Sequence, residues 1–441
     1  QGQLKGLSTQ VQPQTIHSIT KLDIMEIHGL SILNCLITIG DEDPNDKLNI
    51  LNKVTVNEVV NLQIKDSYQT LINTATVEFT RQITVKSSLK DEFGTREVKL
   101  MGDKDSLFKR GKRINIKLCY GIDENLKTMF DGYITSIVSG NPFTLECEDM
   151  GYILKQTALD PIKTSAKGTK INEFVPTILK GTGIELHPST KEMNMEIGQI
   201  VYPQSCTAAD ILNRLKKWGI MCYMRNYNGI PHLAIGRTFF SVNTSESLLK
   251  DMPDTPYDIE FDENVAEDNL SIHKLDPALI ALEAIALYPN NSMFKATIRR
   301  DPKDLSKFQV VNETKISKNQ LKNTLLSEYD KNNNLTNQYG GKNTKIDLSA
   351  YNIRTFHEYN VNRDTLIKNA EAKFGEISQT GIDGDLTIFG DFGLQAGCKI
   401  RLTDNLNPER NGTYVVSEVI TTFGVKGYRQ KLKIPYKLSD K

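Results

Sequence analysis

Residues 397–438 read GCKIRLTDNLNPERNGTYVVSEVITTFGVKGYRQKLKIPYKL. Apolar and polar residues alternate here, Asn411-Gly412 interrupts the alternation with a turn signal, and two further alternating runs follow. Successive side chains of a strand point to opposite faces of a sheet, so a period of two predicts strands with one buried and one solvated face. The stretch therefore predicts an antiparallel β-meander.

Sequence of the same kind occurs earlier in the chain. Residues 111–116 and 397–402 share the pattern G-x-[KR]-I-x-[IL]. Further pairs of segments follow the same order: 61–64 with 269–272, 133–138 with 415–420 and, more weakly, 77–81 with 296–300. Alternating β-branched sequences match one another readily, so each pair says little alone. Their shared order predicts an internal repeat.

The chain of 441 residues is too long for one ordinary core and predicts two to four domains. The predicted fold class is mainly β with an α+β insert, in which two similar tube-type β-barrel domains are separated by a small helix-plus-hairpin domain. The predicted division is 1–50, N-terminal arm and first strands; 51–158, first tube-like β-barrel; 159–240, small α+β insert; 241–266, connector; and 267–441, second tube-like β-barrel with a helix and loop insertion at 301–385. Three copies of two similar barrels would give a ring of near-sixfold symmetry.

Helical spacing appears in three places outside the strands. In the second of them, Thr207 can cap the helix with Asp210 three residues later, and in the first Pro176 must start or kink the helix. The predictions are helices at 169–182, 207–218 and 364–374, a hairpin of 220–225 with 230–235 across Asn228-Gly229, and a mobile Asn- and Lys-rich loop at 318–345.

Composition limits the possible function. Lys plus Arg equals Asp plus Glu at 54 each, so the chain lacks the basic excess of a dedicated nucleic-acid binder. We expect no transmembrane helix, since no apolar run approaches the necessary length, and no signal peptide in the polar start, hence synthesis in the cytoplasm. The six cysteines lack metal-site or redox spacing and predict small buried apolar residues in a reducing compartment: Cys35, Cys119, Cys147, Cys206, Cys222 and Cys398.

No catalytic constellation is present. The chain has no G-x-S-x-G, H-E-x-x-H or G-x-x-x-x-G-K-[ST] pattern, so we predict no enzyme, cofactor or metal site. Four features could also be sites, but a structural interpretation is favoured for each. Residues 109–113 are predicted to form a charged turn rather than a DNA contact, and residues 383–385 a turn rather than a calcium loop. Asp262-Glu263 is predicted to lie in a solvated loop rather than to supply glycosidase carboxylates, and Trp218 to be a core residue rather than a ligand platform.

Several segments resemble a known family. Residues 130–134 (FDGYI) through 143–149 (FTLECED) resemble the first barrel of phage late-control D and tail-hub proteins. Residues 207–212 (TAADIL), followed by Trp218-Gly219 and a hairpin, resemble the helical insert of that group, and 397–438 resembles its second barrel. The resemblance covers about 50–438 and extends to the hub half of type VI secretion spike proteins.

The resemblance implies a structural homotrimeric baseplate hub with a central channel, located in a virion tail or related injection particle. Its partners would be a hexameric tail-tube protein and a trimeric spike protein, with DNA passing through the channel without specific binding. Because the chain stops after the second barrel, the spike is expected to be a separate chain, and the segment 86–105 is a candidate reach to a neighbouring subunit. Phage tail, tailocin and secretion-type injector remain open. The alternatives are a multidomain β-rich glycan- or surface-binding protein and a cell-wall hydrolase.

Overall fold

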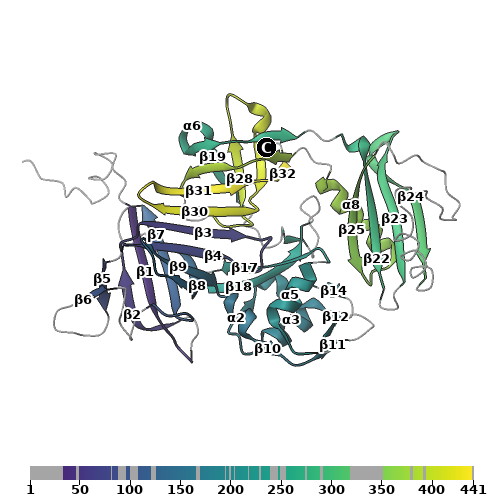
Figure 1. Ribbon diagram of the computed structural model, residues 1–441. Coiled ribbons are helices and arrows are strands. Elements are labelled where there is room, and N and C mark those ends of the chain that lie inside the picture. The colour runs from purple at the N-terminus through teal and green to yellow at the C-terminus, as the bar shows by residue number, and fades with distance from the viewer. Residues whose placement is uncertain are drawn as a thin grey trace, which may run out of the picture.

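The computed structural model in Figure 1 describes residues 33–45, 49–80, 82–87, 96–99, 108–120, 126–164, 169–193, 195–197, 200–202, 204–216, 218–227, 230–238, 247–248, 255–273, 276–288, 292–317, 351–377, 381–390 and 394–439. The predicted N-terminal arm, the loop at 318–345 and most of the segment 86–105 lie outside these ranges.

The N-terminal third forms antiparallel strands, as the period of two predicts. In the third strand the apolar residues Leu62 and Ile64 are buried, whereas the polar residues Gln63 and Lys65 between them are exposed. The buried side chains form one apolar core. The strands are β1 (Leu33–Glu42), β2 (Ile50–Val56), β3 (Asn61–Ser67), β4 (Thr74–Phe79), β5 (Gln82–Ser87), β6 (Arg96–Lys99), β7 (Arg113–Tyr120), β8 (Lys127–Val138) and β9 (Phe143–Asp149).

The predicted small α+β part follows and has a core of its own. The second predicted helix is confirmed as α5, and its cap is as expected: Thr207 N donates to Asp210 Oδ2 at 2.9 Å and Asp210 N donates to Thr207 Oγ1 at 3.2 Å. Pro176 lies inside the first helix, α3, rather than at its start.

The elements of this part include the predicted hairpin as β17 and β18. They are α2 (Tyr152–Gln156), β10 (Ala158–Leu159), β11 (Ile162–Lys163), β12 (Thr169–Lys170), α3 (Ile171–Leu179), β13 (Glu185–Leu186), α4 (Pro188–Lys191), β14 (Glu196–Ile197), β15 (Val201–Tyr202), β16 (Cys206–Thr207), α5 (Ala208–Lys216), β17 (Ile220–Tyr227) and β18 (Ile230–Arg237).

The next strands begin a second β-rich part, which a separate module interrupts. This inserted module is a four-stranded sheet of order β24-β23-β22-β25 with one helix packed on it, and it lies at the right of Figure 1. Its elements are η3 (Pro277–Leu279), β22 (Ile280–Leu287), β23 (Met293–Asp301), β24 (Asp304–Ile316), β25 (Asn352–Tyr359) and α8 (Arg363–Ile377). The third predicted helix is confirmed as α8. We propose that the insertion runs over 280–377 rather than 301–385, because β22 and β23 pair only within it.

The C-terminal β-rich part contains the predicted meander and has a third main core. Its elements are β19 (Tyr257–Glu260), α6 (Phe261–Asn264), β20 (Val265–Asp268), β21 (Ser271–His273), β26 (Gly381–Asp383), β27 (Leu386–Phe389), β28 (Lys399–Thr403), η4 (Pro408–Arg410), β29 (Gly412–Val415), β30 (Glu418–Gly424), β31 (Gly427–Lys433) and β32 (Tyr436–Ser439).

The mainly-β class with an α+β insert is confirmed, with an unexpected connection between the β-rich parts. β3 of the first part pairs with β30 of the second from Asn61 opposite Gly424 to Ser67 opposite Glu418. One antiparallel sheet of 13 strands therefore crosses the molecule, in the order β20-β27-β31-β30-β3-β4-β9-β8-β7-β1-β2-β5-β6. The described strands of neither part close into a barrel on themselves.

Backbone geometry supports the internal repeat at its strongest anchor. Gly111 N donates to Ile134 O at 2.7 Å, and Gly397 N donates to Val416 O at 2.8 Å. Both glycines have a left-handed backbone, with φ of 86° and 85°. The ladders that follow are in the same register: Arg113 faces Tyr133 as Lys399 faces Val415.

The weaker anchors differ from the prediction. Strand order makes β20, β27, β31 and β30 the counterparts of β3, β4, β9 and β8. The counterpart of β3 is thus β20, just before the predicted segment 269–272. The echo of 77–81 in 296–300 is wrong, because 296–300 lies in β23 of the inserted module. Alternation alone cannot distinguish one strand from another.

Candidate functional site

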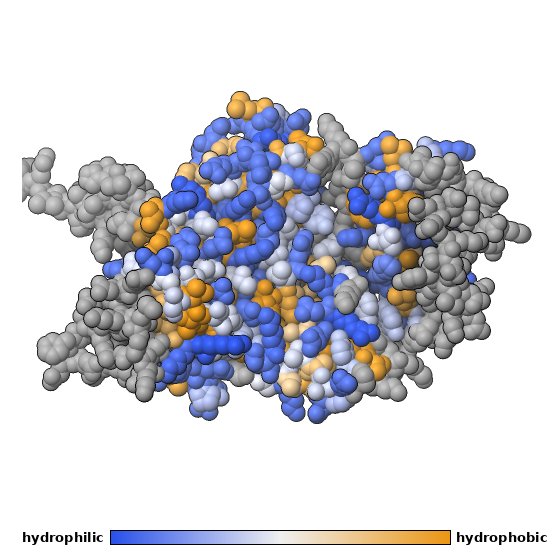
Figure 2. Space-filling model, in the orientation of Figure 1, coloured by the Kyte–Doolittle hydropathy of each residue, from blue (hydrophilic) through white to orange (hydrophobic). Residues whose placement is uncertain are grey.

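The 13-stranded sheet contains a run of eight strands to which each repeat contributes four. The run is β20-β27-β31-β30 followed by β3-β4-β9-β8, and we call it the eight-strand run. The surface over β30 and β31 is largely hydrophilic in Figure 2. Its exposed side carries paired charges: Glu418 lies 3.2 Å from Lys65 and 2.7 Å from Lys433, and Lys431 lies 2.7 Å from Asp385. Desolvation of Glu418 opposes ionisation, but the two lysines hold its pKa below the usual value.

Both ends of the eight-strand run have unpaired backbone among the described residues. β20 pairs only with β27. At the other end, β8 pairs with β7 from Lys127 to Tyr133, Ile134 still bonds to the backbone of Gly111 and Lys112, and residues 135–138 continue past that partner. Val138 at the end of β8 is 49% exposed. Unpaired strand edges bind other strands readily, so each end is a candidate interface.

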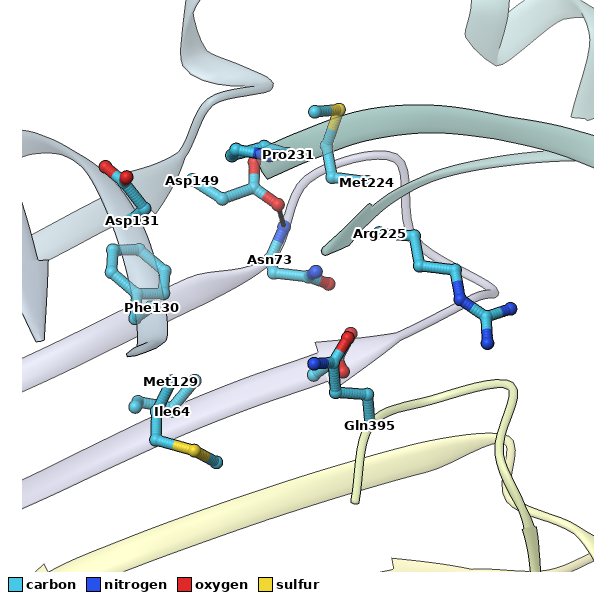
Figure 3. Close-up of a pocket in the computed structure, with 11 residues that line it drawn as sticks. Ile64, Asn73, Met129, Phe130, Asp131, Asp149, Met224, Arg225, Pro231 and Gln395 are labelled. Atoms are coloured by element: carbon cyan, nitrogen blue, oxygen red, sulfur yellow. Dashed lines mark hydrogen bonds between the residues drawn. The ribbon is translucent and has the colours of Figure 1, made fainter. Parts of the chain in front are cut away.

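A polar cavity lies beside the run, where the two repeats and the α+β part meet (Figure 3). Its volume is about 70 Å³, room for a few water molecules. Asp66 on β3 accepts a hydrogen bond from Ala396 N of the second repeat at 2.8 Å. Arg225 of β17 and Gln395 also line the cavity, so residues from three parts of the chain surround it. We call this cavity and the residues that line it the junction.

A second carboxylate stabilises the wall of the junction. Asp149 at the end of β9 accepts hydrogen bonds from Asn73 N at 2.9 Å and Gly151 N at 2.8 Å (Figure 3 draws the first). Burial raises the pKa of Asp66 to about 6, although the amide of Ala396 and the charge of Arg225 oppose the rise. Burial raises the pKa of Asp149 to about 8, and Asp66 adds to that rise.

The junction has the character of a structural joint. Backbone N–H groups donate to Asp66 and Asp149, and no Ser, Thr, Cys or His is among the described residues that line the cavity to serve as a nucleophile or its base. Within the described ranges, no three His, Cys, Asp or Glu side chains gather in a way that could hold a metal ion.

A buried ion pair attaches the inserted module to the α+β part. Arg237 at the end of β18 donates to both oxygens of Glu358 on β25, at 2.6 and 2.7 Å. Arg237 also donates to Trp218 O at 3.4 Å, and the ring of Trp218 stacks on Tyr359 with centroids 4.9 Å apart. Lys373 of α8 donates to Thr238 at 3.2 Å. These polar contacts fix the module beside the hairpin.

The basic run at 109–113 is largely structural. Arg113 is fully buried, pairs with Asp131 and lies over the ring of Tyr133, while Lys112 lies 2.8 Å from Asp41. Residues 109 and 110 are exposed. The charged-turn interpretation therefore agrees with the geometry.

The other weighed features also lie where the structural interpretation places them. Gly384 turns between β26 and β27 at a φ of 109°, and Asn269 fills the space a side chain would need. Asp262 and Glu263 are exposed in α6. Trp218 packs against the core of the α+β part just after α5 ends. Five cysteines are buried, Cys206 is half-buried, and none forms a disulfide. No helix in the described ranges has the length and apolarity to cross a bilayer.

No protein-family model matches the chain, and no curated protein sequence matches it. Solved structures do. The crystal structure of a tail protein from Neisseria meningitidis MC58 matches over 91% of this chain and 96% of its own, with 10% identity and a TM-score of 0.50. The chain shares the fold of this tail protein. A chain of the lidded Francisella PdpA–VgrG complex matches 95% of this chain with 56% of its own length, again at 10% identity and a TM-score of 0.50. The predicted resemblance is thus confirmed as a likeness of fold.

Proposed function

We propose that the protein is a structural, non-enzymatic hub of a phage tail or related injection particle, and that three copies form a ring around a central channel. The eight-strand run carries this proposal. Inside one chain, β3 of the first repeat already pairs with β30, the counterpart of β8. Repetition of that contact between chains would pair β20, the counterpart of β3, with the free end of β8 in the next copy.

The two contacts together would close a ring in which both ends of each eight-strand run are paired. Three copies of the eight-strand run supply 24 strands. At about 4.8 Å between strands, the circumference is about 115 Å and the diameter about 37 Å before strand tilt. Barrels of this size leave an aqueous channel. The paired charges on the exposed side of the run would then line a polar channel without a basic excess, suited to passing DNA without holding it.

Two repeats in each of three copies also give six similar ring segments. Such a ring can match a sixfold tube protein on one face and a threefold spike protein on the other. These partners, the baseplate location and a reach of the segment 86–105 to a neighbour belong to the same proposal. The fold shared with the tail protein from Neisseria meningitidis supports it.

The test compares two exposed apolar residues. Val138 at the free end of β8 is 49% exposed, and Leu305 on β24 of the inserted module is 50% exposed. We expect a trimer in native mass spectrometry and a ring in negative-stain microscopy for the parent protein. Val138→Lys should weaken assembly about tenfold or more, because a buried charge at a strand contact is costly, whereas Leu305→Lys should leave it unchanged.

A parent protein that stays monomeric at high concentration, alone and with its spike and tube partners, refutes the ring. Equal effects of both substitutions would show that β8 is not the contact. In either case the fold itself is unaffected, since both side chains are on the surface.

A further inference from the structure

An arginine of the α+β part is sandwiched by aromatic rings and faces an open pocket. The guanidinium of Arg214 on α5 lies 5.5 Å from the ring centroid of Tyr202 and 5.8 Å from that of Trp218. The pocket has a volume of about 620 Å³ and is lined by Tyr202, Asp210, Asn213, Arg214 and Trp218. It is separate from the eight-strand run and from the junction.

Neighbouring contacts hold these walls in place. The hydroxyl of Tyr202 donates to the backbone oxygen of Asp210 at 3.2 Å, which orients its ring. On the far side, the ring of Trp218 stacks on Tyr359 of the inserted module at an interplanar angle of 18°. The arginine therefore meets two aromatic faces that are fixed before any ligand arrives, and little ordering remains to be done on binding.

The guanidinium keeps its hydrogen-bonding edge available. No carboxylate of the described residues lies within ion-pair distance of Arg214. The nearest candidate in the pocket, Asp210, uses Oδ2 to accept hydrogen bonds from N and Oγ1 of Thr207, at 2.9 and 2.8 Å. A contact with an aromatic ring does not use the N–H groups of the guanidinium, which form a planar fork suited to a carboxylate.

Local charge decides which anion fits. Among the described residues that line the pocket, Arg214 is the one cation and Asp210 is a negative neighbour, which is a poor match for a dianionic phosphate. A carboxylate carries one charge, matches the planar fork, and can also accept from the exposed amide of Asn213. Tyr, Trp and Arg together are the residues enriched at the centres of protein–protein interfaces.

We propose that this pocket binds a glutamate or aspartate side chain of a partner protein. The proposal is independent of the ring. Trp218 is the only tryptophan of the chain, so all tryptophan fluorescence comes from a residue that lines this pocket.

The experiment titrates the full chain with a tetraglutamate peptide and, separately, with inorganic phosphate, while Trp218 emission is recorded. Its variants are Arg214→Gln, Arg214→Lys, which keeps the charge but loses the fork, and Lys216→Gln, which removes an exposed charge of the same helix outside the pocket. We expect saturable quenching by the peptide at about millimolar concentration, and a half-saturation about tenfold higher in Arg214→Gln.

Arg214→Lys should lie between the parent and Arg214→Gln, and Lys216→Gln should match the parent. If phosphate quenches as well as the peptide does, the pocket is a general anion site and the proposal is wrong. Absence of quenching by the peptide at about 10 mM, or an equal loss in Lys216→Gln, also overturns it.

Discussion

Replacing Glu358 with Gln should loosen the inserted module from the rest of the protein. Glu358 and Arg237 are 1% and 4% exposed, so neither charge is solvated by water, and they form two short hydrogen bonds. The substitution removes the carboxylate charge that faces the buried guanidinium in this pair. Removing one partner of such a pair costs about 3–5 kcal/mol, because the remaining charge keeps its desolvation penalty.

An ion pair within the module provides a matched control. Arg363 pairs with Glu313, and their side chains are 51% and 32% exposed. Exposed pairs contribute about 0.2–1 kcal/mol, so Glu313→Gln should have little effect. The two substitutions remove the same charge from the same module and differ in burial and in whether the pair crosses to the α+β part.

Urea unfolding followed by tryptophan fluorescence measures the difference. Trp218 accepts a hydrogen bond from Arg237 through its backbone oxygen and stacks on Tyr359, the residue after Glu358. With a slope of about 2 kcal/mol per molar urea, a loss of 3–5 kcal/mol lowers the midpoint by about 1.5–2.5 M. Emission of native Glu358→Gln should also shift to longer wavelength as Trp218 gains contact with water.

A double variant shows whether the reasoning about buried charge holds. Arg237→Met combined with Glu358→Leu removes both charges and keeps apolar volume, so it should be more stable than Glu358→Gln alone. If the double variant is as unstable as the single one, or if Glu358→Gln shifts the midpoint no more than Glu313→Gln, the desolvation argument is refuted.

Other perturbations test the junction, the repeat and the cysteines. The pKa of Asp149 is raised to about 8 in the folded protein, which therefore binds the proton of this carboxyl more tightly than the unfolded chain does. The protonated carboxyl stabilises the fold at low pH. This contribution to the free energy of unfolding is lost, at up to about 1.4 kcal/mol per pH unit, as the pH rises from about 4 to 8. The slope of unfolding free energy against pH in urea titrations should therefore flatten in Asp149→Asn; an unchanged slope contradicts this. Gly111→Ala should lower the free energy of unfolding by about 1–2 kcal/mol, because Gly111 has a left-handed backbone. Gly397→Ala should lower it more, because the new Cβ would also lie 3.3 Å from the Tyr223 hydroxyl. Equal losses of stability in calorimetry would show that this close contact does not matter. A thiol reagent should modify only Cys206 in the native protein and no cysteine after Cys206→Ser, since the other five are buried, and burial raises the pKa of Cys35 to about 12; modification of a second thiol would contradict this.

Local features of the fold follow from sequence, because their signals are local. Alternation identified β3, β4 and β28 to β31, and the Thr207–Asp210 spacing placed the start of α5. Helical spacing also located α8. Each of these patterns arises within a few residues and requires no knowledge of the partner that buries the apolar face.

The contacts that make the candidate site are long-range and have no such signal. The Oγ of Ser67 donates to Ser417 O across a separation of 350 residues, and Asp66 accepts from Ala396 across 330. Alternation predicts that a segment is a strand but not which strand it pairs with, so the sequence does not predict the pairing of β3 with β30. Asp66 and Asp149 are polar residues in strand sequences, which also fits a solvated face. Only the packing of three parts around them reveals that they face a cavity.

In the proposed ring, the repeats differ at the position where one copy would contact the next. In the first repeat the counterpart strand is continuous, as β8, with a bulge between Ile134 and Ser136; in the second it is broken after Val415 into β29 and β30. The edge of β30 is already covered by β3 of the same chain, whereas the equivalent end of β8 is uncovered among the described residues. Two equivalent edges, one satisfied and one not, make the chain directional: each copy offers one edge and needs another.

Contacts of that head-to-tail kind close a ring only when the rotation per copy divides a full turn, and otherwise give filaments. In the proposed ring, a rotation relates the β3–β30 contact inside one chain to the β20–β8 contact between chains. The angle between the two repeats sets this rotation, and the hydrogen bond from Ala396 to Asp66 helps to fix that angle. Asp66→Ala should therefore broaden the distribution of oligomers in native mass spectrometry before it prevents association, and a variant that keeps one sharp oligomeric state would show that the sheet alone sets the angle.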